Sequence, residues 1–511
     1  MKTFPRLGMM VAAVVAMVGV TSCHQPPDVV VQKALEQSTA LCAQGQSQAA
    51  VATLRKIYDD KDYASFRQRL LGAMLCINLS TGRVEAAQAL FREAAAADPS
   101  QAAPVVGMIE ENLFNSGRFD DLATWCASLQ PLGFKDAQLT ALADYHMKAL
   151  EAGGKLGEIV KVLPGYLGRL PEAAGLALIE RQFAFVVRAK NFEAADGLVA
   201  LVAGGTSSPA RAGLAARMRV DLLIVQGKRA EAEGFFRQQA ATLPEDAASA
   251  ILRRLIDCAN RERQVGASDA LCRFVLDSVK DRPALRDAAA ESWLANAQAL
   301  GSVDGMVERF VTLRKDGLKP AFLAVQLDRQ YGFIMEKGAK QQFGPLLDLC
   351  QGFVAELNDD DRARVSNIML DFCFYLDRFE TALAIVEKGV PGRDEKSMKT
   401  LAAKIRGHLL LQQGKPQEAV ASFREFMGYI AQEQGDQIDP VKGTRVTKEM
   451  ILGLNAKRIG DILAGAADKE GAVKAYQEAR DDYTTALKSF AESSAEYAKL
   501  KADIAAIPAA P

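Results

Sequence analysis

The sequence lacks an excess of charge of either sign, and this excludes the class of function that depends most on charge. Its 511 residues include 62 lysines and arginines against 63 aspartates and glutamates, a formal net charge of -1. Nucleic-acid-binding proteins usually carry a basic excess, because phosphate contacts dominate their affinity. Strand-like runs of valine, isoleucine and threonine joined by Asn-Gly turns are missing too. We therefore predict an all-α protein that does not bind nucleic acid.

Signatures of catalysis and metal binding are also missing. The sequence contains no H-E-x-x-H, no G-x-S-x-G and no Walker-type G-x-x-x-x-G-K-[ST] segment. Of its three histidines, His146 and His408 are isolated on predicted helices, where a histidine is more often a hydrogen-bonded structural residue than a ligand. We therefore expect no catalytic residues, no metal site and no cofactor, and we predict that the protein is not an enzyme.

Long hydrophobic runs are absent except near the N-terminus. Lys2 and Arg6 flank the start of an apolar stretch over residues 7–20, and Cys23 follows it. The stretch is shorter than the ~20 residues of an ordinary membrane-spanning helix, but it suits a secretory signal. The segment resembles the bacterial lipoprotein signal. Two other interpretations are an ordinary signal peptide with a chance cysteine and a membrane anchor.

The resemblance to lipoproteins implies a location. Residues 1–22 would be removed, Cys23 would carry thioether-linked lipid and further acyl groups such as palmitate, and residues 23–28 would form a short lipidated tether. His24 follows the cysteine, and not the aspartate that favours inner-membrane retention in enteric bacteria. We therefore expect secretion across the inner membrane and a lipid anchor in the cell envelope, at the outer membrane.

The most extensive feature that is present is an internal repeat. Short turns recur every 35 to 39 residues, at Gly45, Gly82, Gly117, Gly154, Lys190, Gly227, Gly266, Gly301, Gly338, Asp377 and Gly414. Five residues after these turns lie Ala50, Ala87, Leu122, Ile159, Ala195, Ala232, Leu271, Met306, Phe343, Ala382 and Ala419. Nine residues after them lie Leu54, Phe91, Cys126, Leu163, Val199, Phe236, Val275, Phe310, Leu347, Val386 and Phe423. All these positions are apolar in a chain that is 49% hydrophobic, so the pattern predicts a repeated structural unit.

The repeat is typical of a helical hairpin. Glycine ends a first helix readily, because a left-handed C-cap costs it nothing sterically. The positions five and nine residues after the turn are one helical turn apart and face the same side of a second helix. Pro99, Pro244 and Pro283 would stop that second helix. One hairpin cannot bury its apolar face alone, so we expect neighbouring hairpins to stack.

Three segments resemble the second half of a tetratricopeptide repeat. They are residues 82–87 with Phe91 and Pro99, residues 227–232 with Phe236 and Pro244, and residues 414–419 with Phe423. The resemblance implies a right-handed superhelical solenoid of about eleven to twelve hairpins, with its repeat array over residues 29–431. In the first helices the family's glycine survives only as Gly407, and its tryptophan position holds no tryptophan.

A different pattern follows the array. Residues 432–445 form a polar linker with glycine and proline, and residues 446–511 are expected to form a helical cap. Apolar residues recur there every seven positions, at Tyr476, Tyr483, Phe490, Tyr497 and Ile504. This seam predicts one long helix of ~50 Å. It would either bind a partner or a second copy, or cover the last face of the array, and we favour the cap.

Without Cys23, seven of the eight cysteines remain, an odd number for an oxidising compartment. Cys258 and Cys272 lie on opposite arms of one predicted hairpin, and Cys350 and Cys373 lie on helices that would pack together, so both pairs are candidate disulfides. The alternative is that all seven are small buried apolar residues. No C-x-x-C segment supports redox or zinc chemistry.

Two functional hypotheses follow. The first is a membrane-anchored interaction scaffold for envelope proteins or peptides, in assembly, secretion or pilus-type machinery, since stacked helical repeats offer extended binding surfaces. The second is a surface glycan- or nutrient-binding lipoprotein of the helical SusD-like type, which resembles glycan-capture proteins of gut bacteria. Such proteins use aromatic platforms and irregular loops, whereas this chain has two tryptophans, Trp125 and Trp293, and regular repeat spacings. The scaffold is therefore favoured.

Overall fold

The described part of the chain is built from helices. The computed structural model describes residues 26–134, 136–204, 208–432, 437–438 and 445–508. In these residues, one pair of two-residue strands is the only regular structure that is not helical. The chain forms two compact units, unit 1 (Met1–Ala247) and unit 2 (Ala248–Pro511). The predicted all-α class is confirmed.

Twelve helical hairpins follow one another in this part of the chain, each with a first and a second helix. The first helices are α2 (Pro27–Ala43), α4 (Arg67–Ser80), α6 (Pro99–Asn115), α8 (Asp136–Ala152), α11 (Glu172–Arg188), α13 (Pro209–Val225), α15 (Glu245–Arg261), α17 (Pro283–Ala299), α19 (Pro320–Lys337), α21 (Asp359–Leu376), α23 (Glu395–Gln412) and α25 (Lys448–Gly465). The second helices are α3 (Ser47–Tyr58), α5 (Val84–Ala97), α7 (Phe119–Leu129), α9 (Leu156–Val162) with its continuation α10 (Pro164–Leu167), α12 (Phe192–Ala203), α14 (Arg229–Gln239), α16 (Val265–Ser278), α18 (Val303–Lys315), α20 (Lys340–Gln351), α22 (Phe379–Lys388), α24 (Pro416–Ala431) and α26 (Lys469–Leu487). The remaining elements are η2 (Lys61–Phe66), η3 (Val354–Glu356), α27 (Ala495–Ala505) and the antiparallel strands β1 (Gln437–Ile438) and β2 (Arg445–Val446), in which Gln437 lies opposite Val446.

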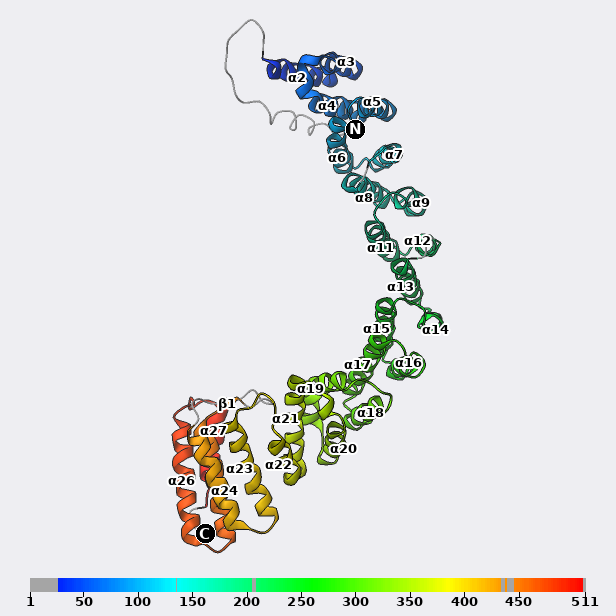
Figure 1. Ribbon diagram of the computed structural model, residues 1–511. Helices are drawn as coiled ribbons and strands as arrows, with labels where there is room; N and C mark the ends of the chain where they lie inside the picture. Colours follow the sequence, from blue (N-terminus) through cyan, green and yellow to red (C-terminus); the bar gives the residue numbers. More distant parts are fainter. Residues whose placement is uncertain (1–25, 135, 205–207, 433–436, 439–444, 509–511) are drawn as a thin grey trace. The chain divides into compact units, whose positions relative to one another are not determined.

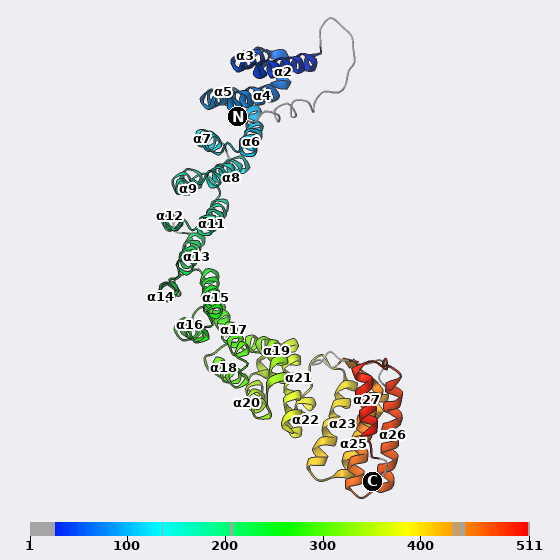
Figure 2. The ribbon, with the colours of Figure 1, turned by 180° about the vertical axis from the view of Figure 1, so that it is seen from behind.

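Within unit 1 the hairpins stack into two layers. The first helices from α4 to α13 follow one another on one side, and the second helices from α5 to α14 follow on the other (Figure 1). The same two layers are visible from behind in Figure 2. The surface that successive first helices share is called the first-helix face. The predicted solenoid of stacked helical hairpins is confirmed.

The predicted repeat frame coincides with the core. The residues five places after the predicted turns are all buried, and so are those nine places after them, apart from the half-buried Val199. Most of the turns hold a residue in the left-handed conformation, from Gly45 (φ 76°) to Gly414 (φ 71°). Each turn reverses the direction of the chain. The buried residues five and nine places after the turn then pack the second helix against the first.

Two predicted turn residues are wrong. Gly266 lies inside α16, and the left-handed residue of that hairpin is Arg263 (φ 57°), three positions earlier. Non-glycine residues rarely adopt the left-handed conformation. The sequence therefore pointed to Gly266 and not to Arg263 as the turn residue. Gly338 ends α19 in an extended conformation (φ -76°, ψ 151°) and not in a left-handed one. The hairpin of α19 and α20 therefore turns differently from the others.

Each of the last two hairpins uses glycine where its two helices cross. A Cβ built on Gly407 would lie 2.9 Å from the ring of Phe423, and one built on Gly460 would lie 2.5 Å from the ring of Tyr476. Gly460 precedes the left-handed turn residue Ala467 by seven positions, as Gly407 precedes Gly414. A glycine seven residues before the left-handed turn residue therefore recurs at Gly460, a position that the sequence pattern had not revealed.

The prediction of one long C-terminal helix is wrong in one respect, because the helix is broken into α26 and α27. α26 ends at Leu487, and α27 begins at Ala495. Ser494 precedes α27 as its N-cap, and its side chain accepts a hydrogen bond from the backbone N–H of Tyr497. Serine favours such N-caps, and this one starts a new helix. Arg480 of α26 donates to the carbonyl of Ile507, so the chain folds back along α26.

Candidate functional site

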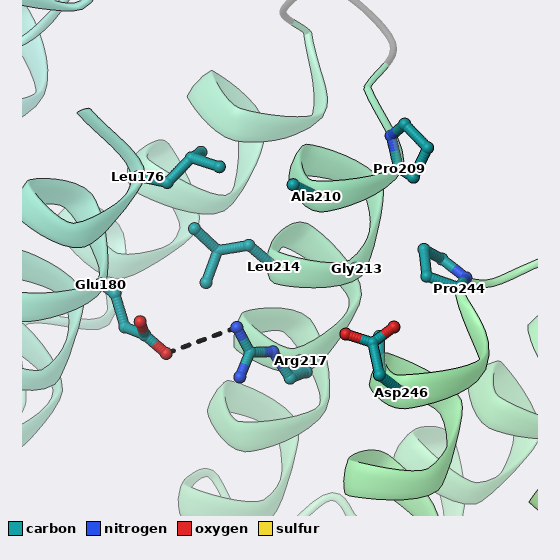
Figure 3. Close-up of a pocket in the computed structure, with 10 residues that line it drawn as sticks. Leu176, Glu180, Pro209, Ala210, Gly213, Leu214, Arg217, Pro244 and Asp246 are labelled. Carbon is teal, nitrogen blue, oxygen red and sulfur yellow. Dashed lines mark ion pairs between the residues drawn. The ribbon is translucent and has the colours of Figure 1, made fainter. Parts of the chain in front are cut away.

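A pocket opens on the first-helix face of unit 1. It lies between α11, α13 and the start of α15, and its volume is about 320 Å³. Its apolar wall is formed by Leu176, Leu214 and two prolines, Pro209 and Pro244. Figure 3 shows these side chains around the opening. A pocket of this size and lining can receive an apolar side chain of a bound segment.

Charged groups line the same pocket. Arg217 of α13 pairs with Glu180 of α11 at an N···O distance of 3.5 Å, drawn in Figure 3, and Asp246 lies beside the prolines. A bound segment could therefore place an apolar side chain between the helices. It could also place a polar side chain beside the basic or the acidic groups of the pocket. No part of this pocket was predicted from the sequence.

The pocket owes its shape to small residues and to prolines. A Cβ built on Gly213 would lie 2.9 Å from the Cβ of Ala247, so α13 and α15 approach closely at this point. Pro209 starts α13, and the Ser208 hydroxyl caps this helix by accepting from the N–H of Arg211. Pro209 is the first residue of α13, and Pro244, about one repeat later, directly precedes the first residue of α15. That spacing was the sequence signal that could have revealed the pocket.

Ion pairs link successive first helices along the face in each unit. In unit 1, Arg181 pairs with Asp144 in addition to the Arg217–Glu180 pair. In unit 2, Arg329 pairs with Glu291 at 2.5 Å. Exposed pairs contribute only about 0–1 kcal/mol each. They recur between neighbouring first helices and place groups of opposite charge side by side on the face.

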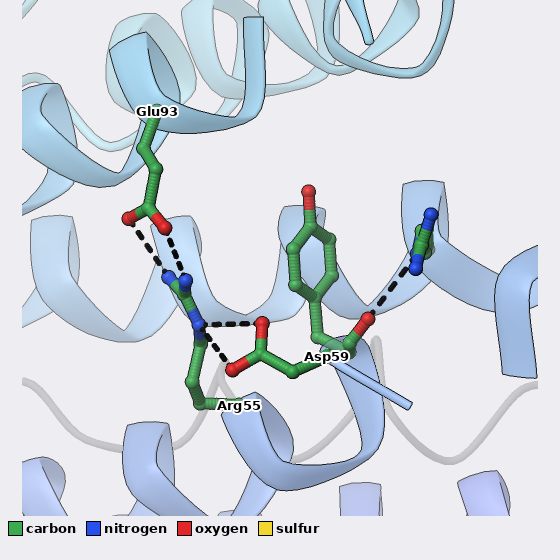
Figure 4. Close-up of polar contacts among 5 residues, drawn as sticks. Arg55, Asp59 and Glu93 are labelled. Atoms are coloured by element: carbon green, nitrogen blue, oxygen red, sulfur yellow. Dashed lines mark hydrogen bonds and ion pairs between the residues drawn. The ribbon is translucent and has the colours of Figure 1, made fainter. Parts of the chain in front are cut away.

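A second network joins the second helices near the N-terminal end of the structure. Arg55 of α3 binds Asp59 at 2.9 Å and both carboxylate oxygens of Glu93 in α5 (Figure 4). This hydrogen bonding holds the pKa of Glu93 below its ordinary value. The network ties the first two hairpins together and offers no reactive group.

Four titratable side chains are buried between hairpins of unit 1. Glu110 of α6 is 1% exposed and accepts a hydrogen bond from the thiol of Cys126 at 3.8 Å, and burial raises the pKa of Glu110 to about 8. Nδ1 of His146 lies 2.9 Å from the hydroxyl of Tyr166, and burial lowers the pKa of His146 to about 4. Tyr166 and Cys126 are fully enclosed. These groups are out of reach of any substrate, and we interpret them as core residues.

The structure contains neither predicted disulfide. Cys272, Cys350 and Cys373 are free thiols, so Cys258 is not bonded to Cys272, and Cys350 is not bonded to Cys373. Each sulfur is enclosed in its own packing: Cys258 donates to Glu262, and burial raises the pKa of Cys272 to about 12 and that of Cys373 to about 11. Of the seven described cysteines, Cys42 and Cys76 are half-buried and the other five are buried, which agrees better with the alternative that they are small packing residues.

The seven-residue aromatic seam belongs to the cap. Tyr476 (3% exposed) and Tyr483 (4% exposed) lie against Gly460 and Gly453 of α25. Phe490 and Ile504 are half-buried and pack against the same C-terminal core, and Tyr497 is half-buried in α27. The two tyrosines are thus unavailable to a partner, and the seam covers the end of the array.

The two tryptophans offer no sugar platform. Trp125 is fully buried. Trp293 is 9% exposed, and the guanidinium groups of Arg273 and Arg309 lie 4.9 and 5.2 Å from the centroid of its ring. Arg309 also pairs with Asp269 at 2.6 Å, which closes the site. Glycan capture by stacking on these rings is therefore disfavoured.

Two searches concern only the described residues. Among them, no three or more His, Cys, Asp and Glu side chains come together in a way that could hold a metal ion. None of their helices is long and apolar enough to cross a membrane. The predicted signal (residues 1–22) and the lipidation site Cys23 lie outside the described residues.

Comparisons with known proteins add no family. No model of a known protein family matches the sequence, and no curated protein matches it. Among solved structures, "Structure of Naa15/Naa10 bound to HypK-THB" matches at 12% identity and a TM-score of 0.25, covering 94% of this chain and 70% of the other. "Crystal structure of APC/C hetero-tetramer Cut9-Hcn1" matches at 12% identity and a TM-score of 0.22, covering 95% and 92%. Scores this low carry no argument about fold or function, which rest on the residues of this chain.

Proposed function

We propose that this chain is a lipid-anchored scaffold of the bacterial cell envelope that binds segments of other envelope proteins on its first-helix face. The observation that carries the proposal is the pocket between α11, α13 and α15, which combines an apolar wall with charged groups on an exposed repeat surface. Stacked repeats extend such a surface over many hairpins, so one scaffold can hold a long segment or several partners. The machinery it serves would be of the assembly, secretion or pilus type.

The anchor part of the proposal depends on the N-terminal sequence. Residues 1–23 have the order of a lipoprotein signal, with basic residues, an apolar stretch and a cysteine. α2 begins at Pro27, only four residues after Cys23, so the first hairpin would lie within ~14 Å of the lipid attachment point. The scaffold would therefore work close to the surface of the outer membrane, its proposed location.

The pocket can be tested by filling it. Ala210 is exposed, lines the pocket and lies in the first turn of α13, whereas Ala212 is exposed on the same helix and does not line it. Crosslinking in the native envelope followed by mass spectrometry should identify a dominant protein partner. We expect Ala210→Trp to reduce that crosslink by roughly tenfold, which corresponds to ~1.4 kcal/mol of binding free energy.

Ala212→Trp is the matched control and should retain the crosslink. Unchanged crosslinking in Ala210→Trp would contradict binding at this pocket. Saturable binding of an oligosaccharide by the purified protein, without any protein partner, would contradict the scaffold role itself.

A further inference from the structure

One histidine is enclosed where the last two hairpins of unit 2 meet. His408 lies on α23, and its ring stacks on Phe379 of α22 with 4.7 Å between ring centroids. The rings of Phe374 and Phe423 stand nearly perpendicular to it at 5.7 and 5.2 Å. From α25 the Arg458 guanidinium donates to Nε2 of His408 at 3.1 Å and lies 5.4 Å from the centroid of Phe423. The contact that His408, Phe423 and Arg458 form between these two hairpins is called the last joint.

The hydrogen bond from Arg458 fixes the protonation state of His408. A guanidinium can only donate, so Nε2 of His408 is the acceptor and the proton of the neutral imidazole is on Nδ1. A second proton would have to bind to Nε2, where it would face the donor of Arg458. The hydrogen bond across the last joint would then be replaced by a contact between two cations.

The cations beside His408 have acidic groups of their own. Lys404, one turn before His408 on α23, and Arg458 are the two positive groups that act on the imidazole. Asp371 of α21 acts on Lys404, and Asp461 of α25 acts on Arg458. The charges of the joint are therefore compensated as long as His408 is neutral.

One acidic group acts on His408 itself. Asp377, the turn residue after α21, favours a protonated imidazole, but its carboxylate also pairs with the ammonium of Lys340 in α20. Burial, together with Arg458 and Lys404, outweighs Asp377 and lowers the pKa of His408 to about 4. An unfolded histidine has a pKa of ~6.5. The closed joint therefore excludes a proton that His408 would bind at pH 5 or 6 if it faced water.

We propose that the last joint is an acid-sensitive contact, in which protonation of His408 favours detachment of the hairpin of α25 and α26 from the rest of unit 2. Histidine is the side chain whose charge changes most readily in mild acid, and protonation at an interface can drive its opening. Opening would expose the ring of Phe423, which is completely buried in the closed joint. The inference goes beyond the proposed scaffold role and depends on neither the unit 1 pocket nor the anchor.

The direction of the effect follows from proton linkage. His408 binds its proton more weakly in the closed joint than in the opened one, so the closed joint is most stable above pH ~6.5 and loses stability as the pH falls from there toward 4. The ratio of opened to closed molecules should rise by up to about tenfold per pH unit in this range. Between pH 7 and pH 5 the rise should be roughly twentyfold.

Hydrogen exchange of the purified full chain measures this opening. After correction for the intrinsic pH dependence of amide exchange, we expect the amides of α25 to exchange roughly twentyfold faster at pH 5 than at pH 7. The amides of α18, a helix without histidine, should change less. His408→Gln keeps an acceptor for Arg458 but cannot be protonated in this range, so it should remove the acid response of α25. His146→Gln is the matched control at a buried histidine of unit 1, and it should leave that response as in the wild type.

An NMR titration of the imidazole signals gives a readout that does not require His408→Gln to fold. The chain has three histidines, and in His146→Gln one of the two that remain should still titrate near pH 4. If both titrate near pH 6.5, His408 is not held neutral and the proposal is overturned. Exchange in α25 that does not rise in mild acid, or that rises equally in the wild type and His408→Gln, would overturn it as well.

Discussion

At the scale of single residues, the repeat decides which ionisable groups are buried. Glu110 lies seven residues before the turn glycine Gly117, and Cys126 lies nine residues after it. These are the two positions that Gly407 and Phe423 occupy in their own hairpin. A long residue on the first helix and a small one on the second fill the same space as glycine facing phenylalanine. Glu110 is thus enclosed by the geometry of the repeat, and no cation is paired with it among the described residues.

The buried carboxyl predicts a pH dependence of stability. The pKa of Glu110 is about 8 in the folded chain, above ~4.3 for an unfolded glutamate, so the folded state holds its proton more tightly. The stability that this proton contributes is fully present below pH ~4 and is lost as the pH rises to about 8, by at most ~1.4 kcal/mol per pH unit. Glu110→Gln cannot ionise and should remove this loss, as urea unfolding at several pH values would show.

Glu111 offers the control for this effect. It is the exposed neighbour on α6, and Glu111→Gln should keep the pH dependence of the wild type. Identical slopes between pH 5 and pH 8 in the wild type and Glu110→Gln would show that the carboxyl is not buried as the structure has it.

At the scale of elements, glycines on α25 set how closely the cap packs. Tyr476 and Tyr483 of α26 are seven residues apart, and so are Gly460 and Gly453, so each tyrosine ring lies over one glycine. Two positions of α26 that lie two helical turns apart thereby approach the backbone of α25. Tyr476 also donates to Asp461 at 2.9 Å, which fixes the ring in place.

A methyl group at this crossing should destabilise unit 2. A Cβ at Gly460 would lie 2.5 Å from the Tyr476 ring, and displacing a packed ring costs about 1–3 kcal/mol, more than the ~1 kcal/mol that alanine gains over glycine in a helix. We therefore expect Gly460→Ala to lower the free energy of unfolding in a urea titration.

Gly465 lies on the same helix, and no atom lies within 4 Å of a Cβ built on it. Gly465→Ala should therefore leave stability unchanged or raise it. Two alanine variants that shift stability equally would mean that helix propensity, and not the tyrosine contact, governs this crossing.

Some of these elements could be predicted from the sequence, and some could not. The apolar positions five and nine residues after each turn, such as Ala87 and Phe91, identify the core because burial of a second helix needs apolar residues at those places. Arg263 gave no signal, since its left-handed conformation comes from the packing of the hairpin and not from its residue type. The pocket combines residues from three hairpins, and their meeting depends on how helices cross in space.

At the scale of the whole molecule, the proposed lipidation of Cys23 would decide where the scaffold acts without affecting how it folds. Cys23 precedes α2, which begins at Pro27, so the array's core contacts start after the proposed anchor. The membrane affinity of the proposed anchor would come from its acyl chains, since each buried CH₂ contributes ~0.8 kcal/mol and several chains hold a protein more firmly than one. Location and fold should therefore be separable by one substitution.

Cys23→Ala should abolish the incorporation of radiolabelled palmitate and move the protein from the membrane fraction to the soluble fraction, while its circular dichroism and Tm stay unchanged. Cys42→Ala is the matched control, because Cys42 is a half-buried thiol within α2 and should have no part in lipidation. Palmitate that persists in Cys23→Ala would assign the lipid to another residue, and a wild-type protein without label would remove the anchor from the proposal. A lowered Tm in Cys23→Ala would mean that the N-terminal segment packs on the array, because only a contact with the folded body could carry that change.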